Sequence, residues 1–341
     1  MTDLSFQEFN TRFLDKVSSV AGQAELQEAG RQYVKTELLE SAFSRAILPQ
    51  EPITTADCQR NINDQSLYLV RDVEPDAEAV GVDNLGEPDG KYVSGTRYII
   101  PVINFTTKRF QITVEDLRAY QYKITKRIED KSVPVLEKLE DKYFMKLVGA
   151  AIGTSGQTGQ KCVKYAGGTA DLVVQTVDIV KLKNTLYEGD ASGRDSKKKE
   201  CACILMNQGT YEYGVTLPSA GDDFGKDRVL NGITSDTLFG TKVIRTIKGD
   251  IVPQGVMWAF TSPDFLGHNF ALGDPSFEIK SNFGLIEWQT KESVAMGLGV
   301  RKSVAVLTLK GSKDPDGVDI TIATDGTYLA ALYNLYANLS I

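Results

Sequence analysis

Apolar residues recur every three or four positions between Thr113 and Ala150, and this is the longest regular pattern in the chain. The spacing places them on one face of an amphipathic helix, and charged residues, Asp141 among them, occupy the remaining surface. At about 1.5 Å per residue the predicted helix is about 50 Å long, which is more than a compact domain needs. The apolar stripe consists of Leu117, Tyr120, Ile124, Ile128, Leu136, Leu139, Tyr143 and Leu147.

The sequence also marks the start, middle and end of this helix. Thr113 and Asp116 have the spacing at which a hydroxyl and a carboxylate cap a first helical turn. Pro134 cannot donate a backbone hydrogen bond, so we expect a kink within one helix rather than two helices. Glycines at positions 149, 153, 156 and 159 are expected to end the helix.

The segment before residue 62 has a different pattern. Residues 4–47 place apolar side chains at helical spacing in two stretches, and Pro49 and Pro52 then end them. No stretch before residue 60 resembles a core strand, so we interpret this segment as an arm that packs on another surface. A helical N-terminal subdomain is the alternative.

Residues 66–113 predict a long two-stranded ribbon. SLYLVRDV alternates apolar and polar residues, and the return run TRYIIPVINFTTKRFQITV is rich in β-branched and aromatic residues. Pro101 within the return run indicates an edge strand or a bulge, because proline lacks the N–H of the ladder. The acidic segment between the two strands cannot fold alone, so it is either a mobile tip or ordered against a neighbouring chain.

The rest of the chain predicts a mixed α/β region. We expect a helix near 169–189, a buried strand at ACILMN, a short helix or turn at QGTYEYGVTL, and strands from Thr237 onwards. The loop containing Lys197–Lys199 is expected to be solvated. Cys201 and Cys203 lie two apart in a strand, so we expect buried thiols that point to the same face.

Composition and charge exclude several classes of protein. The 341 residues are 42% hydrophobic and 24% charged, as in a soluble globular protein of one large or two ordinary domains. No apolar run is long enough to cross a membrane, the N-terminus lacks a signal-peptide pattern, and the cysteines form no disulfide framework. We therefore expect a cytoplasmic protein. The net charge of −7 argues against a nucleic-acid reader.

Catalytic motifs are absent from the sequence. His268 is the one histidine, and no GxSxG elbow, HExxH, P-loop, Rossmann or EF-hand pattern accompanies it. Adjacent acids such as Asp222 and Asp223 are interpreted as solvated surface. We expect no catalytic, cofactor-binding or metal site.

The order of these parts resembles the major capsid protein of tailed bacteriophages, the Hong Kong ninety-seven type. The resemblance covers residues 1 to about 310 and is carried by YLVRDVEP with GTRYIIPVINFTTKRFQITVEDL, by DTLFGTKVIRTIKGDIVPQGVMWAFTSPDFLG, and by IEWQTKESVAMGLGVRKSVAVLTLK. It implies an α+β fold. The implied parts are an N-terminal arm (1–62), an extended β-hairpin or E-loop (63–112), the spine helix of a P domain (113–155), a mixed α/β A domain that returns to the P domain near its end (156–290), a P-domain strand (291–310) and a C-terminal tail (311–341).

The same resemblance implies a non-enzymatic structural subunit of an icosahedral viral head. It would assemble into pentamers and hexamers around double-stranded DNA, in the host cytoplasm and then in the virion. The implied partners are other copies of the chain, a separate scaffolding protein, a portal and a cement protein, with DNA nearby, no sequence-specific binding and no membrane. The alternatives are an encapsulin-like nanocompartment shell and a β-rich hydrolase or binding protein that would use His268.

Subunit contacts are expected from the arm, the hairpin and the helix. Lys91 lies near the hairpin tip and is the candidate for the cross-link to an Asn that some family members form. No motif identifies the Asn, so we favour salt bridges from Lys91 to acidic residues of the next subunit. The expected interface residues are Phe6, Phe9, Phe13, Glu74, Asp76, Asp83, Lys91, Arg118 and Arg127.

Overall fold

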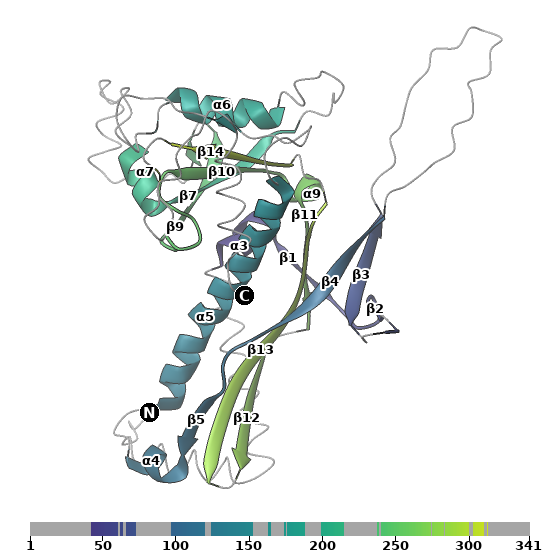
Figure 1. Ribbon diagram of the computed structural model, residues 1–341, viewed down its shortest axis with the longest axis vertical. Helices are drawn as coiled ribbons and strands as arrows, with labels where there is room; N and C mark the ends of the chain where they lie inside the picture. Colours follow the sequence, from purple (N-terminus) through teal and green to yellow (C-terminus); the bar gives the residue numbers. More distant parts are fainter. Residues whose placement is uncertain are drawn as a thin grey trace, which may run out of the picture.

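The computed structural model is an elongated α+β molecule in which one long helix joins two sheets (Figure 1). It describes residues 42–60, 62–63, 66–72, 97–119, 124–152, 163–164, 174, 176–187, 199–214, 237–238, 240–273, 275–282, 284–299, 303–309 and 312.

The long helix is α5, Ile124–Ile152, and Pro134 lies inside it without ending it. The prediction of one helix from Thr113 is wrong at its N-terminal end. Val114–Ala119 form a separate helix, α4, which lies below the lower end of α5 and beside β5 in Figure 1. The reason is packing: Leu117 is buried in a small core at this tip, whereas the apolar face of α5 belongs to the main core.

The predicted cap is nevertheless confirmed, on α4. The backbone N–H of Asp116 donates to Thr113 Oγ1 at 3.0 Å, and Thr113 Oγ1 donates to the Asp116 carboxylate at 2.7 Å. Thr113 is also the last residue of strand β5, Phe110–Thr113, so the cap marks the point where the chain leaves the sheet.

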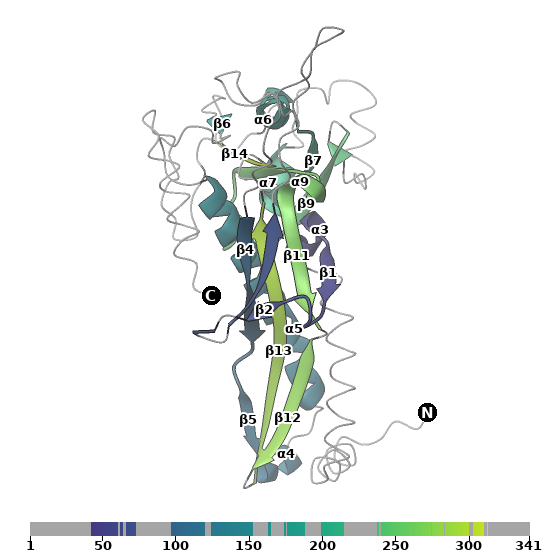
Figure 2. The same cartoon turned by 90° about the vertical axis from the view of Figure 1, so that its right-hand side faces the viewer.

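Strand β13, Leu285–Leu298, forms the axis of the eight-stranded sheet and lies along α5. Its first half lies between β12, Ser276–Asn282, and β5. Its second half lies between β11, Gly267–Leu272, and β4, Arg97–Thr106. Figure 2 shows β13 running along the length of the molecule, with β11 beside its upper part and β12 beside its lower part.

The predicted ribbon is confirmed by β3, Leu67–Asp72, which pairs antiparallel with β4. Residues 97–101 of β4 pair with β3, and residues 102–106 pair with β13. Among the described residues, Pro101 therefore lies where β4 has a neighbour on one side, which agrees with the predicted edge position. The tip, residues 73–96, lies outside the described residues.

The prediction that no core strand precedes residue 60 is wrong. Gln50–Ile53 form β1, which pairs parallel with β11 at the edge of the large sheet, and Gln59–Arg60 form β2, which pairs with β3. An edge strand tolerates the missing N–H of Pro52. Before β1 lies helix α3, Phe43–Ile47, whose apolar residues join the main core. Residues 42–53 thus pack within their own chain, and residues 1–41 lie outside the described part.

The second sheet has six strands, and both of its faces are buried. Helix α6, Thr176–Tyr187, packs on the face that includes Met257 and Ala259. The C-terminal half of α5 packs on the face that includes Trp258 and Phe260. The strand order is β6 (Val163–Lys164), β14 (Val304–Thr308), β10 (Val256–Thr261), β7 (Cys201–Asn207), β9 (Thr241–Thr246) and β8 (Thr237–Leu238), with α7 (Gln208–Gly214) and α9 (Pro263–Leu266) near its ends.

Two predictions near β7 need correction. The pairing of β7 with β10 shifts register between Phe260 and Thr261, so Cys203 faces the α5 side while Cys201 faces the α6 side. Burial raises the pKa of Cys201 to about 11 and that of Cys203 to about 12, so both remain thiols at neutral pH. Lys199 is buried rather than solvated, and its Nζ donates to Ser303 Oγ at 3.0 Å.

Candidate functional site

A buried ionic network joins four elements where α5 meets the large sheet. Arg45 of α3 extends its guanidinium between Glu140 of α5 and Glu292 of β13. Arg45 Nε donates to Glu140 Oε2 at 2.8 Å and to Oε1 at 3.1 Å, and Nη2 donates to Glu292 Oε1. From β11, Asn269 Nδ2 lies 3.4 Å from both Glu140 Oε1 and the Leu48 carbonyl oxygen. The three charged side chains are each less than one-tenth exposed.

A second buried ion pair lies beside this network on α5. Asp141 accepts the backbone N–H of Ser44 at 2.9 Å and Lys248 Nζ at 2.6 Å. The Lys248 ammonium also lies 5.7 Å from the centre of the Phe43 ring. The expectation that Asp141 is on the exposed face of the helix is wrong, because α3 and the segment after β9 cover this side of α5.

Burial dominates the electrostatics of the network. It raises the pKa of Glu140 to about 7; the charge of Arg45 opposes this rise, whereas those of Glu292 and Asp141 add to it. Burial likewise raises the pKa of Asp141 against the effect of Lys248. For Arg45, burial would lower the pKa, but the charges of Glu140 and Glu292 outweigh it and the pKa is raised.

The network is suited to holding elements together rather than to chemistry on a substrate. Each charge meets an opposite charge from another element, so the docking of α3 on α5 depends on complete pairing. The sequence analysis missed these residues, although a signal was present. Glu140 is the polar member of an i+4 row whose other members, Leu136, Phe144 and Val148, are all buried and apolar.

The described residues do not test the interface residues predicted from the sequence. Backbone positions are described for Arg118, in α4, and Arg127, in α5, without their side chains. The remaining predicted residues, Phe6, Phe9, Phe13, Glu74, Asp76, Asp83 and Lys91, lie outside the described residues.

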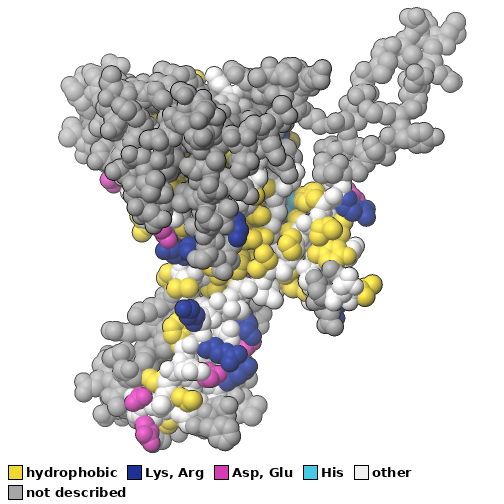
Figure 3. Space-filling view, viewed as in Figure 1, with side chains coloured by type: hydrophobic (Ala, Val, Ile, Leu, Met, Phe, Trp, Pro, Cys, Tyr) yellow, Lys and Arg dark blue, Asp and Glu magenta, His cyan; other side chains and the backbone are white. Residues whose placement is uncertain are grey.

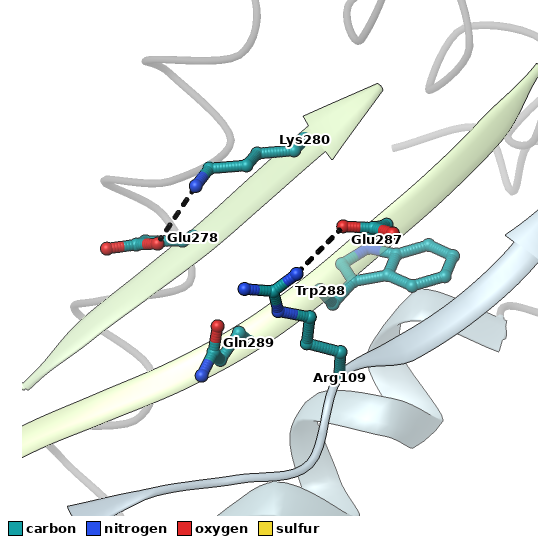
Figure 4. A pocket seen from close by; sticks show the side chains of 6 residues that line it. All are labelled: Arg109, Glu278, Lys280, Glu287, Trp288 and Gln289. Carbon is teal, nitrogen blue, oxygen red and sulfur yellow. Dashed lines mark ion pairs between the residues drawn. The ribbon is translucent and has the colours of Figure 1, made fainter. Parts of the chain in front are cut away.

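A shallow pocket lies between β12, β13 and the residues before β5 (Figure 4). Its volume is about 10 Å³, which is room for about one water molecule. Its charged groups already pair: Arg109 Nη1 lies 3.9 Å from Glu287 Oε2, and Lys280 Nζ lies 3.8 Å from Glu278 Oε2. Drug-sized ligands occupy several hundred Å³, so this pocket offers no substrate site of ordinary size.

The described residues also give no support to a hydrolytic site at His268. Its ring stacks on Phe270 of the same strand, with centroids 5.3 Å apart and planes 14° apart. In the described part of the chain, no group of three or more His, Cys, Asp or Glu residues could hold a metal ion. Within the same residues, no helix is long and apolar enough to cross a bilayer.

Exposed apolar side chains are present on the β3–β4 ribbon. In Figure 3 hydrophobic side chains gather over this ribbon and the middle of the molecule, and charged side chains lie mainly below them. Ile99 of β4 is 63% exposed, in the part of β4 that β13 does not cover. An apolar surface on a projecting element is typical of a contact with another protein.

No family model matches the sequence, and no curated protein matches it. Solved structures do match. One is titled Microbacterium phage Oxtober96, with a TM-score of 0.53, 12% identity, and coverage of 80% of this chain and 92% of that chain. The virus-like particle from Pyrococcus furiosus gives a TM-score of 0.51, 13% identity, and coverage of 83% and 99%. The capsid of the cyanophage P-SCSP1u gives 0.49, 10% identity, and coverage of 73% and 85%. The chain therefore shares the α+β fold of the virus-like particle and of the Microbacterium phage structure, in agreement with the fold that the sequence resemblance implied.

Proposed function

We propose that the chain is the repeating structural subunit of an icosahedral phage head, which assembles into pentamers and hexamers around double-stranded DNA. The observation that carries this proposal is its fold. The chain matches 99% of the subunit of a virus-like particle, so the likeness extends over a whole shell subunit rather than one shared motif. Shells of this kind need heterologous contacts that close into rings, and an elongated subunit with a projecting ribbon is suited to them.

In this proposal each part of the fold has a role in the shell. Helix α5 with the sheet around β13 is the spine and P domain, and the six-stranded sheet with α6 is the A domain. The β3–β4 ribbon is the base of the E-loop, which lies on a neighbouring subunit. Residues 1–41 are the arm, and the segment 311–341 is a tail that packs on its own or a neighbouring subunit.

The ribbon supports this assignment because it leaves the body with an open edge. Within the described part of the chain, residues 97–101 of β4 pair with β3 on one side only, and Ile99 is exposed there. A neighbouring subunit would bury this surface and form the contacts that we assign to Glu74, Asp76, Asp83 and Lys91.

The net charge of −7 suits a shell that encloses DNA without binding it tightly. A separate scaffolding protein, a portal and a cement protein complete the proposed set of partners, in the host cytoplasm during assembly.

A nanocompartment shell that holds protein cargo is the second candidate, and the similarity to a virus-like particle favours it specifically. The particle contents distinguish the two. Particles purified from infected or lysogenic cells would contain double-stranded DNA if the chain forms a phage head. A constant protein cargo and no DNA would support the nanocompartment.

The proposed function is tested by expressing the chain alone, purifying it and imaging it by negative-stain microscopy. Closed shells, tubes or rings of five and six are the expected products. A monodisperse monomer at high concentration, under conditions where the chain is folded, would contradict the proposal.

A further inference from the structure

The lower part of the large sheet, formed by β5, β12 and β13, has one apolar face and one polar face. The apolar face carries a small buried core that includes Trp288 of β13. Side chains alternate along a strand, so Glu287 and Gln289 lie on the opposite face. Their cross-strand partners on β12, Lys280 and Glu278, lie on that same face.

The positive groups lie outermost on this polar face. The side chains of Arg109 and Lys280 are 61% and 69% exposed, whereas those of Glu287 and Glu278 are 22% and 32% exposed. Lys291 adds a third positive charge and is 39% exposed. This face therefore presents positive charge to a partner, although the chain as a whole carries a net charge of −7.

The two most exposed cations make only long contacts. The carboxylates of this face already accept hydrogen bonds, at 2.6 Å from Gln111 and at 2.9 Å from Lys291. Arg109 and Lys280 lie 3.9 and 3.8 Å from the same carboxylates, which is beyond hydrogen-bond length. Among the described residues, the N–H groups of these two cations are thus open to further acceptors beside the shallow pocket (Figure 4).

The chain itself contains a segment of complementary charge. Residues 73–96, which join β3 to β4, include six Asp or Glu residues and one lysine, for a net charge of −5. The ribbon ends at Asp72 and Arg97, whereas the other end of β4 lies beside the polar face (Figure 1). Since β4 has 10 residues, these ends are about 30 Å apart at about 3.3 Å per residue. The ribbon therefore leads the segment away from its own polar face, which favours a second copy as the partner.

We propose that the polar face of β12 and β13 is the docking surface for segment 73–96 of a neighbouring copy, whose carboxylates pair with Arg109 and Lys280. This inference rests on the shell function proposed above and names the surface that receives the ribbon. Carboxylates suit both cations, because a guanidinium can bind them through two parallel N–H groups and an ammonium binds them as a point charge. The pairs lie at an exposed surface, so salt should weaken them.

Carbodiimide cross-linking of assembled particles tests this contact directly. The reagent joins a lysine to a carboxylate that lies in contact with it. Particles are assembled from an equal mixture of light and heavy isotope-labelled chains, so a cross-link between copies can join peptides of different label. We expect mixed-label pairs between Lys280 and segment 73–96. Absence of this pair, or pairs that always carry a single label, would overturn the proposal.

Charge reversal tests whether assembly depends on the contact. Arg109→Glu with Lys280→Glu reverses the face, and Asp83→Lys with Glu87→Lys reverses the segment. Each double variant should form at least about tenfold fewer particles than wild type, because like charges then meet. A mixture of the two variants should recover assembly, because alternating copies in a ring of six meet opposite charges at every contact. Lys242→Glu, which reverses an exposed cation on β9, is the control and should assemble normally.

These results separate the docking surface from the shell function. A face variant with the wild-type thermal midpoint that assembles normally, or a loss that mixing does not restore, would overturn the docking surface and leave the shell function intact. If wild type forms no particles, the shell function fails, and binding of a synthetic 73–96 peptide to the unassembled chain tests the surface alone. The face variant should bind this peptide at least about tenfold more weakly. Equal affinities, or tighter binding of double-stranded DNA than of the peptide at the same ionic strength, would overturn the proposal.

Discussion

At the scale of single residues, the buried charges of Arg45, Glu140, Asp141 and Glu292 are each paired with a side chain from another element. The network joins three elements that lie far apart in the sequence, through Arg45, Glu140 and Glu292. Each ion pair therefore connects two elements. A buried pair of this kind adds little net stability when complete, but it is costly to break. Its effect is to make the docking of α3 specific.

Removal of the central charge should therefore have a large effect. Arg45→Ala leaves two buried carboxylates without their guanidinium and should lower the free energy of unfolding by about 3–5 kcal/mol. Urea denaturation measures this loss. The matched control is Arg97→Ala, which breaks the exposed ion pair to Asp72 at 2.7 Å and should leave the midpoint unchanged. Equal midpoints for both variants would contradict a structural role for the network.

One glycine at the start of β11 is required by a close approach of two strands. Gly267 has a φ of 154°, and a Cβ at this position would lie 2.2 Å from the carbonyl oxygen of Gly297 on β13. The backbone at Gly297 cannot move aside as a flexible side chain can. Gly267→Ala should therefore lower the free energy of unfolding by more than about 2 kcal/mol.

Gly273 provides a control for the effect of backbone conformation alone. It also has a positive φ, of 75°, but a Cβ there meets nothing within 4 Å. Gly273→Ala should therefore lower the thermal midpoint less than Gly267→Ala does. A larger loss in the Gly273 variant would show that the close approach to Gly297 is not the cause.

At the scale of elements, the hydrophobic pattern predicted those helices and strands whose formation depends mainly on residues close together in the sequence. The apolar stripe predicted α5 and the alternation in 66–113 predicted the ribbon, because these patterns report which face of an element is buried. Runs separated by Gly, Asp and Pro predicted β10, β12 and β14. The pattern failed where contacts with distant parts of the chain determine which residues are buried. Pro52 suggested a stop but lies in edge strand β1, and Asp141 looked solvated because the residues that cover it come from α3 and the segment after β9.

The cysteines and the ionic network show the same limit on prediction. A strict alternation placed Cys201 and Cys203 on one face, but a register shift against β10 puts them on opposite faces. No sequence pattern encodes such a bulge. Glu140 could have been noticed as a polar residue in a buried row, but its partners Arg45 and Glu292 become neighbours only in the folded chain.

Pro134 provides the prediction at this scale. It is exposed within α5, where proline forfeits a helical hydrogen bond and costs up to about 3 kcal/mol relative to alanine. Pro134→Ala should thus raise the thermal midpoint of the unassembled subunit. If a bend at Pro134 lets the spine follow a curved shell, the same variant should form fewer closed shells under the microscope.

Val135→Ala serves as the control for this experiment, because Val135 is the exposed neighbour of Pro134 on the same helix. It should change stability by no more than about 0.5 kcal/mol and leave assembly intact. If the Pro134→Ala variant is more stable and still forms normal shells, the proposed role of a bend at Pro134 in shell curvature is wrong. The assignment of α5 as the spine helix would not be affected.

At the scale of the whole molecule, the elongated shape of the chain is the feature on which the proposed shell function depends. One helix and one long strand run along its length, and a ribbon with an exposed Ile99 projects from its side (Figure 1). The order of these parts was predictable because each is a run of contiguous sequence. The contacts between subunits were not, since they depend on residues of other copies, and the predicted interface residues stay a prediction.

The most direct test of the central claim is a cryo-electron microscopy reconstruction of the particles formed by this chain. The account predicts an icosahedral shell in which the chain occurs in rings of five and six, with α5 in the shell wall and the β3–β4 ribbon lying on the neighbouring subunit. A reconstruction without icosahedral order, or one in which the ribbon contacts no other subunit, would contradict it.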